Sequence, residues 1–175
     1  AAGPACLAMS EATASQPPHV ALSGVVRNYE GPPAVYALGP IDLQIRRGEF
    51  FSVVGPSGCG KSTLLDVLCG LVRPTSGSVR FEGRELRGEV PDGVGVVFQD
   101  DSSMRWLSVR QNVGFGLRTS GLPKKETAER VDHAIRFMGL SQFADHYPAQ
   151  LSGGMRQRVC IARTLVLQPR LILLD

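Results

Sequence analysis

The chain has 175 residues, of which 43% are apolar and 20% charged. These values are typical of a folded globular chain and exclude disordered, collagen-like and coiled-coil classes. The length favours one domain, or a core with a subdomain. The net charge of +3 is too small to indicate nucleic acid as a partner, and no apolar run is long enough for a membrane-spanning helix.

The first 18 residues are rich in Ala, Ser and Pro, and they lack the basic start and apolar core of a signal peptide. We therefore expect a flexible tail over residues 1–18. The cysteines form no CxxC pair and no cluster with histidine, which predicts free thiols in a reducing compartment. They are Cys6, Cys59, Cys69 and Cys160.

Antiparallel strands are predicted near the N-terminus. Residues 20–27 and 41–45 alternate imperfectly between apolar and polar side chains, as half-buried strands do. Pro32 and Pro33 break the segment between them. Residues 79–81 form a weaker strand candidate between two glycines.

A glycine-rich loop follows a β-rich apolar run over residues 50–54, which predicts a strand. Residues 55–62 match GxxxxGK[ST], and apolar residues at helical spacing come next. Glycines let backbone N–H groups converge on an anion, and the helix N-terminus adds positive charge. Lys61 would bridge the β- and γ-phosphates of ATP, and Ser62 would bind Mg²⁺. Nucleotide contacts are predicted for Gly55, Pro56, Ser57, Gly58, Cys59, Gly60, Lys61, Ser62 and Thr63.

The second half of the chain reads as mainly helical. After a short apolar strand over residues 94–98, Val131, Ile135 and Met138 share one face of a helix between Pro123 and Gly139. A later helix should begin after Gly154 and end before Pro169; its apolar face carries Met155, Val159, Ala162 and Val166. The pattern predicts an α/β core with a helical insertion over about residues 100–150.

Two further segments carry candidate ligand contacts. Residues 171–174 read as a strand buried on both faces, and Asp175 follows at its carboxyl end, where it could hold Mg²⁺. Residues 151–158, LSGGMRQR, place the good N-cap residue Ser152 and two glycines at a helix start. This helix end could bind an anion, or it could simply be a capped helix.

In this order, the phosphate loop, Gln99, LSGGMRQR and the strand ending at Asp175 resemble the ATP-binding cassette (ABC) ATPases of transporters. The resemblance covers residues 20–175. It implies an α/β fold: a P-loop NTPase core of ABC type with an N-terminal antiparallel β part and a helical subdomain, within one domain over residues 19–175. The segment from Phe98 to Val113 most resembles the importers of nitrate, sulfonate, taurine and bicarbonate, although Arg105 stands where that group usually has proline.

The resemblance assigns further roles. Tyr29 takes the place of the aromatic residue that stacks on adenine. Gln99 would sense Mg²⁺ and link the core to the helical subdomain, which makes it a catalytic residue beside Lys61 and a metal contact beside Ser62 and Asp175. The signature segment would contact the nucleotide held by a partner subunit, through Leu151, Ser152, Gly153, Gly154 and Gln157.

The resemblance also implies partners. Two cassettes, in a homodimer, would bind head to tail and drive transmembrane permease subunits through residues 99–113, at the cytoplasmic face of the membrane. A periplasmic or surface substrate-binding protein would take part indirectly. Trp106 would be an exposed partner contact or, alternatively, a buried anchor.

In this family the catalytic glutamate directly follows the aspartate at position 175, so it would lie beyond the chain end. We therefore expect a fragment that lacks the C-terminal part of the core and hydrolyses little ATP. Two alternatives stay open: a non-transport ABC ATPase, and a nucleotide-binding or interaction module that does not hydrolyse ATP.

Overall fold

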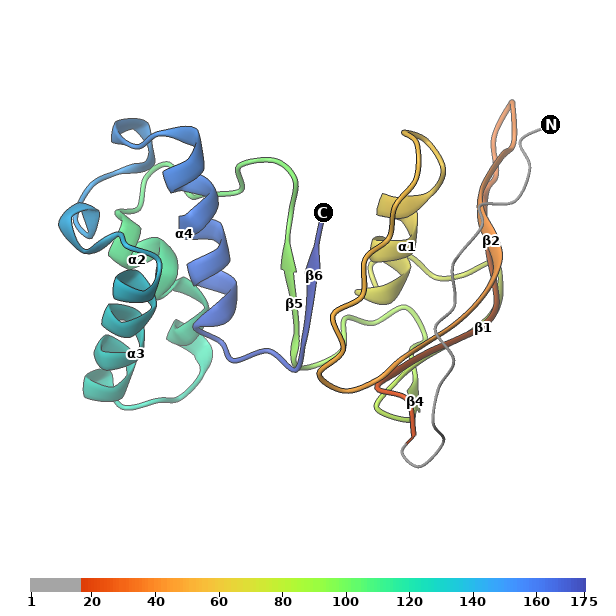
Figure 1. The fold of residues 1–175 in the computed structure, drawn as a ribbon, viewed down its shortest axis with the longest axis horizontal. Helices are drawn as coiled ribbons and strands as arrows, with labels where there is room; N and C mark the ends of the chain where they lie inside the picture. The colour runs from red at the N-terminus through yellow and green to blue at the C-terminus, as the bar shows by residue number, and fades with distance from the viewer. Residues whose placement is uncertain (1–16) are drawn as a thin grey trace. The chain divides into compact units, whose positions relative to one another are not determined.

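The computed structural model describes residues 17–175, which form two compact units divided after Pro91 (Figure 1). The tail predicted over residues 1–18 lies outside the described part, except for its last two residues. No helix between residues 17 and 175 has the length and apolar character needed to cross a membrane.

A four-stranded antiparallel sheet, in the order β2-β1-β3-β4, forms most of the first unit. Its strands are β1 (Val20–Tyr29), β2 (Val35–Ile45), β3 (Ser76–Phe81) and β4 (Arg84–Glu85). The central strand β1 buries Val20, Leu22 and Val25, as its alternating pattern predicted. The antiparallel strands are therefore confirmed, although β2 begins at Val35 rather than at Ile41.

Helix α1 (Lys61–Leu68) follows the glycine-rich loop and buries Leu64, Val67 and Leu68. The strand predicted over residues 50–54 is wrong, because the described chain forms no strand there. An apolar run becomes a strand only where a neighbouring strand accepts its backbone hydrogen bonds, and no strand of residues 17–91 pairs with this segment. Phe50 and Val54 are accordingly 88% and 90% exposed.

The second unit contains a parallel pair, β5 (Val94–Val97) and β6 (Leu171–Leu174). The strand expected over residues 94–98 is thus confirmed up to Val97. Helix α4 (Gly153–Leu165) packs on β5, where the Thr164 hydroxyl donates to the Val96 carbonyl oxygen at 3.3 Å. The prediction that residues 171–174 are buried on both faces is wrong: Leu173 is buried, but Ile172 and Leu174, on the opposite face, are exposed.

Helices α2 (Val109–Val113), α3 (Lys124–Phe137) and α4 share one hydrophobic cluster. Helix α3 begins after Pro123 and ends before Gly139, which has a φ of +66°, so this predicted helix is confirmed. Short 3₁₀ turns connect these helices at Phe115–Thr119, Ser141–Phe143 and Pro148–Gln150. The cluster includes Val109, Val113, Leu117, Val131, Ile135, Leu140, Leu151, Val159, Ala162 and Val166.

Candidate nucleotide-binding site

The phosphate loop of the first unit depends on glycine at defined positions. Gly60, the N-cap of α1, has a φ of +96°, and a Cβ there would lie 2.4 Å from the Ala37 carbonyl oxygen on β2. Gly58 also has a left-handed backbone, with a φ of +80°. Any other residue at position 60 would therefore be strained and would collide with a backbone atom. Glycine at position 60 therefore allows the loop to pack closely on the sheet.

Lys61 places its ammonium group inside the loop. Its Nζ donates hydrogen bonds to the carbonyl oxygens of Gly55, at 2.9 Å, and Pro56, at 2.8 Å. The Cys59 sulfur lies 3.7 Å from the same nitrogen. Helix α1 begins at Lys61 without a side-chain cap, so its N-terminal backbone dipoles add to this positive charge. The arrangement suits a phosphate group.

Tyr29 and the phosphate loop line the same cavity, of about 340 Å³. This volume lies within the range of small-molecule sites. Of the predicted residues, the cavity brings together Tyr29, Gly58, Gly60, Lys61, Ser62 and Thr63; Gly55, Pro56, Ser57 and Cys59 belong to the loop but do not line it. The cavity thus joins an aromatic ring to a phosphate-binding type of loop within one unit.

Three residues of this cavity were missed by sequence reasoning: Val35, Tyr36 and Ala37. All three belong to the first part of β2, where Val35 pairs with Tyr29 and Tyr36 with Asn28. The signal was the turn at Pro32 and Pro33, because a hairpin returning from Tyr29 places the next residues opposite it. The predicted second strand began only at Ile41.

Two metal candidates end neighbouring strands of the second unit. Val97 pairs with Leu174 in the parallel register, and the Asp175 amide donates to the Val97 carbonyl oxygen at 3.0 Å. Asp175 and Gln99 therefore follow the same edge of the pair. Ser62, the third candidate, lies in the first turn of α1 in the first unit. All three offer oxygen ligands, which fit Mg²⁺. Residues 17–175 contain no group of three or more His, Cys, Asp or Glu side chains suited to a metal.

The signature segment forms a capped helix start. Ser152 is the N-cap of α4, and its Oγ accepts a hydrogen bond from the Met155 amide at 3.3 Å. Gly153 and Gly154 are exposed beside it, while Leu151 is buried in the helical cluster. Gln157 is half-buried on the next turn. The exposed N-terminus of this long helix leaves room for a ligand from outside the unit.

An ion pair that the sequence analysis missed ties the segment after Gln99 to this helix. Arg156 Nε lies 2.6 Å from Asp101 Oδ2, and Arg163 donates to the Ser102 carbonyl oxygen at 2.9 Å. Partial burial acts to raise the pKa of Asp101, but hydrogen bonds from Ser103 and the charge of Arg156 outweigh it, so this pKa lies below its ordinary value. The partners are 55 residues apart along the chain, and no local pattern relates them.

Trp106 is an exposed residue, at 75%, rather than a buried anchor. Its segment is held by Asn112, which is fully buried. Asn112 Oδ1 accepts from the Met104 amide at 2.8 Å, and Nδ2 donates to the carbonyl oxygens of Leu107 and Ser108 at 2.9 and 3.1 Å. The loop that carries Trp106 is therefore fixed by a satisfied buried amide.

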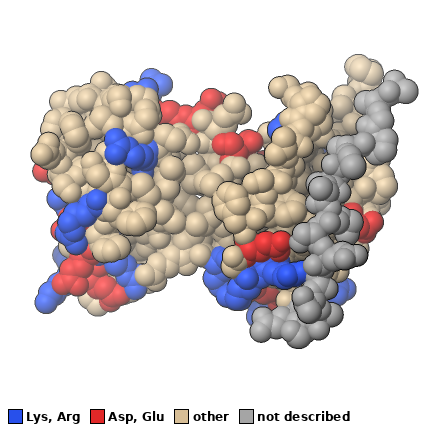
Figure 2. Space-filling view, in the orientation of Figure 1, with Lys and Arg blue, Asp and Glu red and all other residues tan. Residues whose placement is uncertain are grey.

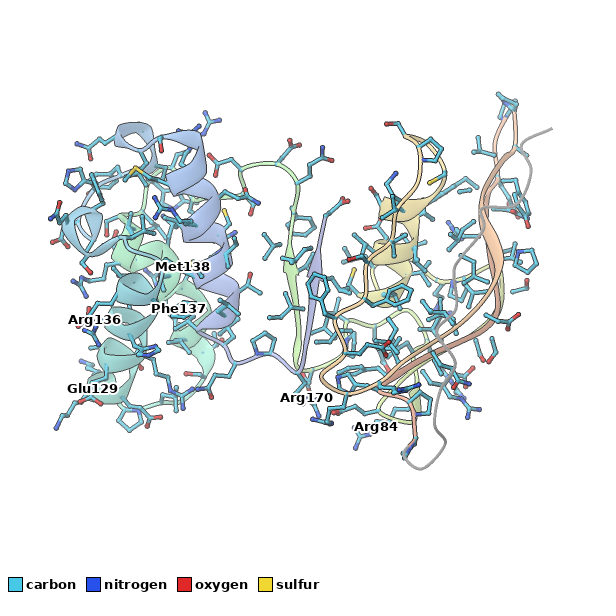
Figure 3. All side chains as sticks on the ribbon, viewed as in Figure 1. Arg84, Glu129, Arg136, Phe137, Met138 and Arg170 are labelled. Atoms are coloured by element: carbon cyan, nitrogen blue, oxygen red, sulfur yellow. The ribbon has the colours of Figure 1, made fainter. Side chains whose placement is uncertain are left out.

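A larger cavity, of about 560 Å³, lies in the second unit between α3 and α4. Glu129, Phe137 and Met138 line it and are labelled in Figure 3. None of the predicted site residues lines this cavity.

The described cysteines are free, and Cys6 lies outside the described residues. Cys59 is exposed in the phosphate loop, whereas Cys69 and Cys160 are buried. Burial raises the pKa of the Cys69 thiol. The expectation of free thiols is confirmed for these three.

Charged side chains of both signs are intermixed on the face that Figure 2 draws.

A family model described as ABC transporter matches residues 38–175. An uncharacterised ABC transporter ATP-binding protein of Methanocaldococcus jannaschii is 50% identical over 81% of this chain and 52% of its own length. The bicarbonate transport ATP-binding protein CmpC of Synechococcus elongatus is 50% identical over 79% of this chain and 21% of its own. The spermidine/putrescine import ATP-binding protein PotA of Nitratidesulfovibrio vulgaris is 45% identical, covering 89% and 42%. The chain thus spans about half the length of these relatives, or less.

Solved structures are also similar to this chain in fold and in sequence. CbiO1 of Clostridium perfringens, part of the ABC transporter complex CbiONQ, has a TM-score of 0.80 at 32% identity, covering 91% of this chain and 66% of its own. A dimeric ATP-binding cassette in a post-hydrolysis state, bound to ADP and phosphate, has a TM-score of 0.80 at 35% identity and covers 89% and 73%. The sequence motifs, the fold and these similarities lead to one conclusion: the chain belongs to the ABC transporter family, as an ATP-binding cassette.

Proposed function

We propose that this chain belongs to the ATP-binding and ATP-hydrolysing subunit of an ABC importer. The observation that carries the proposal is the cavity shared by Tyr29 and the phosphate loop. Lys61 and the start of α1 would hold the phosphates, Ser62 would bind Mg²⁺, and the Tyr29 ring would stack on the adenine. Bound Mg²⁺ would neutralise charge on the phosphates.

Calorimetry with MgATP tests this binding site directly. Lys61→Ala should weaken binding by about tenfold or more, because it removes a charge-assisted contact to phosphate. Lys125→Ala, at an exposed position of α3, is the matched control and should bind like the wild type. Equal affinity in the wild type and Lys61→Ala would contradict the assignment.

Hydrolysis requires a group that orients or deprotonates water. Among the described residues that line the cavity there is no carboxylate and no histidine. None of these cavity residues can activate water, and we therefore propose that the 175-residue chain binds MgATP but releases phosphate very slowly. Phosphate release at saturating MgATP measures this, and turnover at about 1 s⁻¹ or faster would contradict it.

The proposal includes a dimer, in which the N-terminus of α4 would bind an anion. The proposal places the start of α4, from Leu151 to Gly154 with Gln157, against nucleotide held by a second copy. Its support is the exposure of Ser152, Gly153 and Gly154 and the dimeric state of a similar cassette. In the complete protein, Ser152→Arg should leave MgATP affinity unchanged and stop turnover. Ser152→Thr keeps the cap and should retain turnover.

Membrane partners follow from the same proposal. Residues 99–113, with Trp106 exposed on a fixed loop, would contact a transmembrane permease at the cytoplasmic face of the membrane, and a substrate-binding protein would deliver the solute. Support comes from CbiO1, which is part of a transporter complex. Trp106→Ala should weaken co-purification with the permease without changing MgATP affinity.

We propose a small anion, such as nitrate, a sulfonate, taurine or bicarbonate, as the solute. The segment from Phe98 to Val113 and the CmpC relative support this choice, whereas the PotA relative imports polyamines. In vesicles with the permease, binding protein loaded with the anion should stimulate ATPase activity. Stimulation by spermidine-loaded protein instead would contradict the choice.

A further inference from the structure

Arg27 stacks on the ring of Tyr29. Its guanidinium carbon lies 4.4 Å from the ring centroid, well within the range of a cation–π contact. The two residues are two positions apart on β1, so their side chains leave the same face of the sheet. The contact is therefore built into the strand.

The Tyr29 ring is the main partner that orients Arg27. Its buried Nε has no hydrogen-bond partner, and Arg27 forms no ion pair among residues 17–175. An arginine in this position gives up part of its hydration, and stacking is what compensates for it. Among residues 17–175, the Arg27 guanidinium therefore interacts with the Tyr29 ring and with no carboxylate.

The backbone between the two residues is also fixed. The Asn28 amide donates to Thr75 Oγ1 at 2.9 Å, and the Thr75 amide donates to the Val26 carbonyl oxygen at 2.7 Å. On the other side, the register with β2 shifts before and after Arg27. This irregular strand end is held in place between β2 and Thr75.

Tyr29 lines the phosphate-loop cavity, but Arg27 does not. An aromatic ring has two faces, and Arg27 covers one of them. Tyr29 remains 36% exposed, which leaves ring surface for the cavity.

We propose that Arg27 is a positioning residue for the nucleotide base: it holds the Tyr29 ring so that the opposite face stacks on the purine. The proposal rests on the adenine-stacking role proposed for Tyr29 above. A ring already held in one rotamer loses less entropy when a base stacks on it. Arg27 should therefore affect base binding and leave phosphate binding unchanged.

The test compares two ligands, MgATP and magnesium tripolyphosphate, by calorimetry on the 175-residue chain. Arg27→Met keeps the length of the side chain and removes its charge. It should weaken MgATP binding about three- to tenfold and leave tripolyphosphate affinity unchanged. Arg27→Lys should restore most of the loss, because an ammonium also binds an aromatic face. Arg84→Met, at an exposed arginine of β4 labelled in Figure 3, is the control and should change neither affinity.

A double-mutant cycle with Tyr29→Leu separates the possible failures. In the Tyr29→Leu background, Arg27→Met should have no further effect on MgATP affinity. An equal effect in both backgrounds, or a parallel loss of tripolyphosphate binding, would show a structural role and overturn the inference. If Tyr29→Leu weakens MgATP binding but Arg27→Met does not, only the inference fails. If Tyr29→Leu binds MgATP like the wild type, base stacking fails as well.

Discussion

Arg156 and Asp101 form an ion pair, with 2.6 Å between Nε and Oδ2, that joins the first turn of α4 to the segment just after Gln99. Arg156 also donates to the Leu151 carbonyl oxygen at 2.6 Å. The Arg156 side chain thus connects Leu151, the first residue of LSGG, to the loop that follows β5. A substitution of Arg156 or Asp101 should therefore disturb the N-terminus of α4.

This pair should make stability depend on acid pH. The pKa of Asp101 is lower in the folded chain than its ordinary value, so the charged carboxylate stabilises the fold above about pH 4. That contribution is lost as the pH falls through the lowered pKa. The pair is about one third exposed and screened, so its contribution should be below about 1 kcal/mol.

Urea unfolding at several pH values measures the effect. Asp101→Asn should lower the unfolding free energy at pH 7, and its difference from the wild type should vanish at the acid end. Asp100→Asn changes an exposed neighbour and serves as the control. A difference that is constant with pH would contradict the prediction.

The glycines of the phosphate loop should differ in their tolerance of a methyl group. At Gly60 a Cβ adds a collision with the Ala37 carbonyl oxygen to the strain of a left-handed backbone, whereas at Gly58 nothing lies within 4 Å. We expect Gly58→Ala to cost about 1 kcal/mol and Gly60→Ala about 2 to 4 kcal/mol of unfolding free energy. Chemical denaturation of both variants gives the comparison, and equal costs would show that backbone strain alone matters.

Removing the buried amide of Asn112 should loosen the loop that carries Trp106. Asn112→Leu has a similar size but leaves the Met104 amide and the Leu107 carbonyl without their partner, which should cost about 2 to 4 kcal/mol. The Trp106 side chain should also become more mobile, which would lower its fluorescence anisotropy. Gln142→Leu, at an exposed position, should change neither value. Unchanged stability in Asn112→Leu would mean that the loop is held in another way.

The described thiols should differ in reactivity. Cys59 is exposed, whereas Cys69 is buried with a raised pKa, so its thiolate is rare at neutral pH. Iodoacetamide at pH 8 followed by peptide mass mapping should label Cys59 at least about tenfold faster than Cys69 or Cys160. In urea the rates should converge, and fast labelling of Cys69 in the native chain would contradict its burial.

Local patterns in the sequence determined the phosphate loop, helix α3 with its start and stop residues, helix α4 apart from its first two residues, Gly153 and Gly154, and the antiparallel strands near the N-terminus. These features depend on neighbours a few residues away: glycine at positive φ, a serine cap, apolar residues at helical spacing. The resemblance to a known family rested on the same short segments. Because these features depend on residues close together in the sequence, they could be predicted without a structure.

Only the tertiary structure decided the rest. Residues 50–54 have the composition of a strand, but no strand of their unit pairs with them. The start of β2 became clear only from its register with β1, which places Tyr36 in the cavity. The ion pair of Asp101 and the contact of Gly60 with Ala37 join distant parts of the chain. Pairing and close approach are properties of two segments at once, and a single segment's pattern carries no record of its partner.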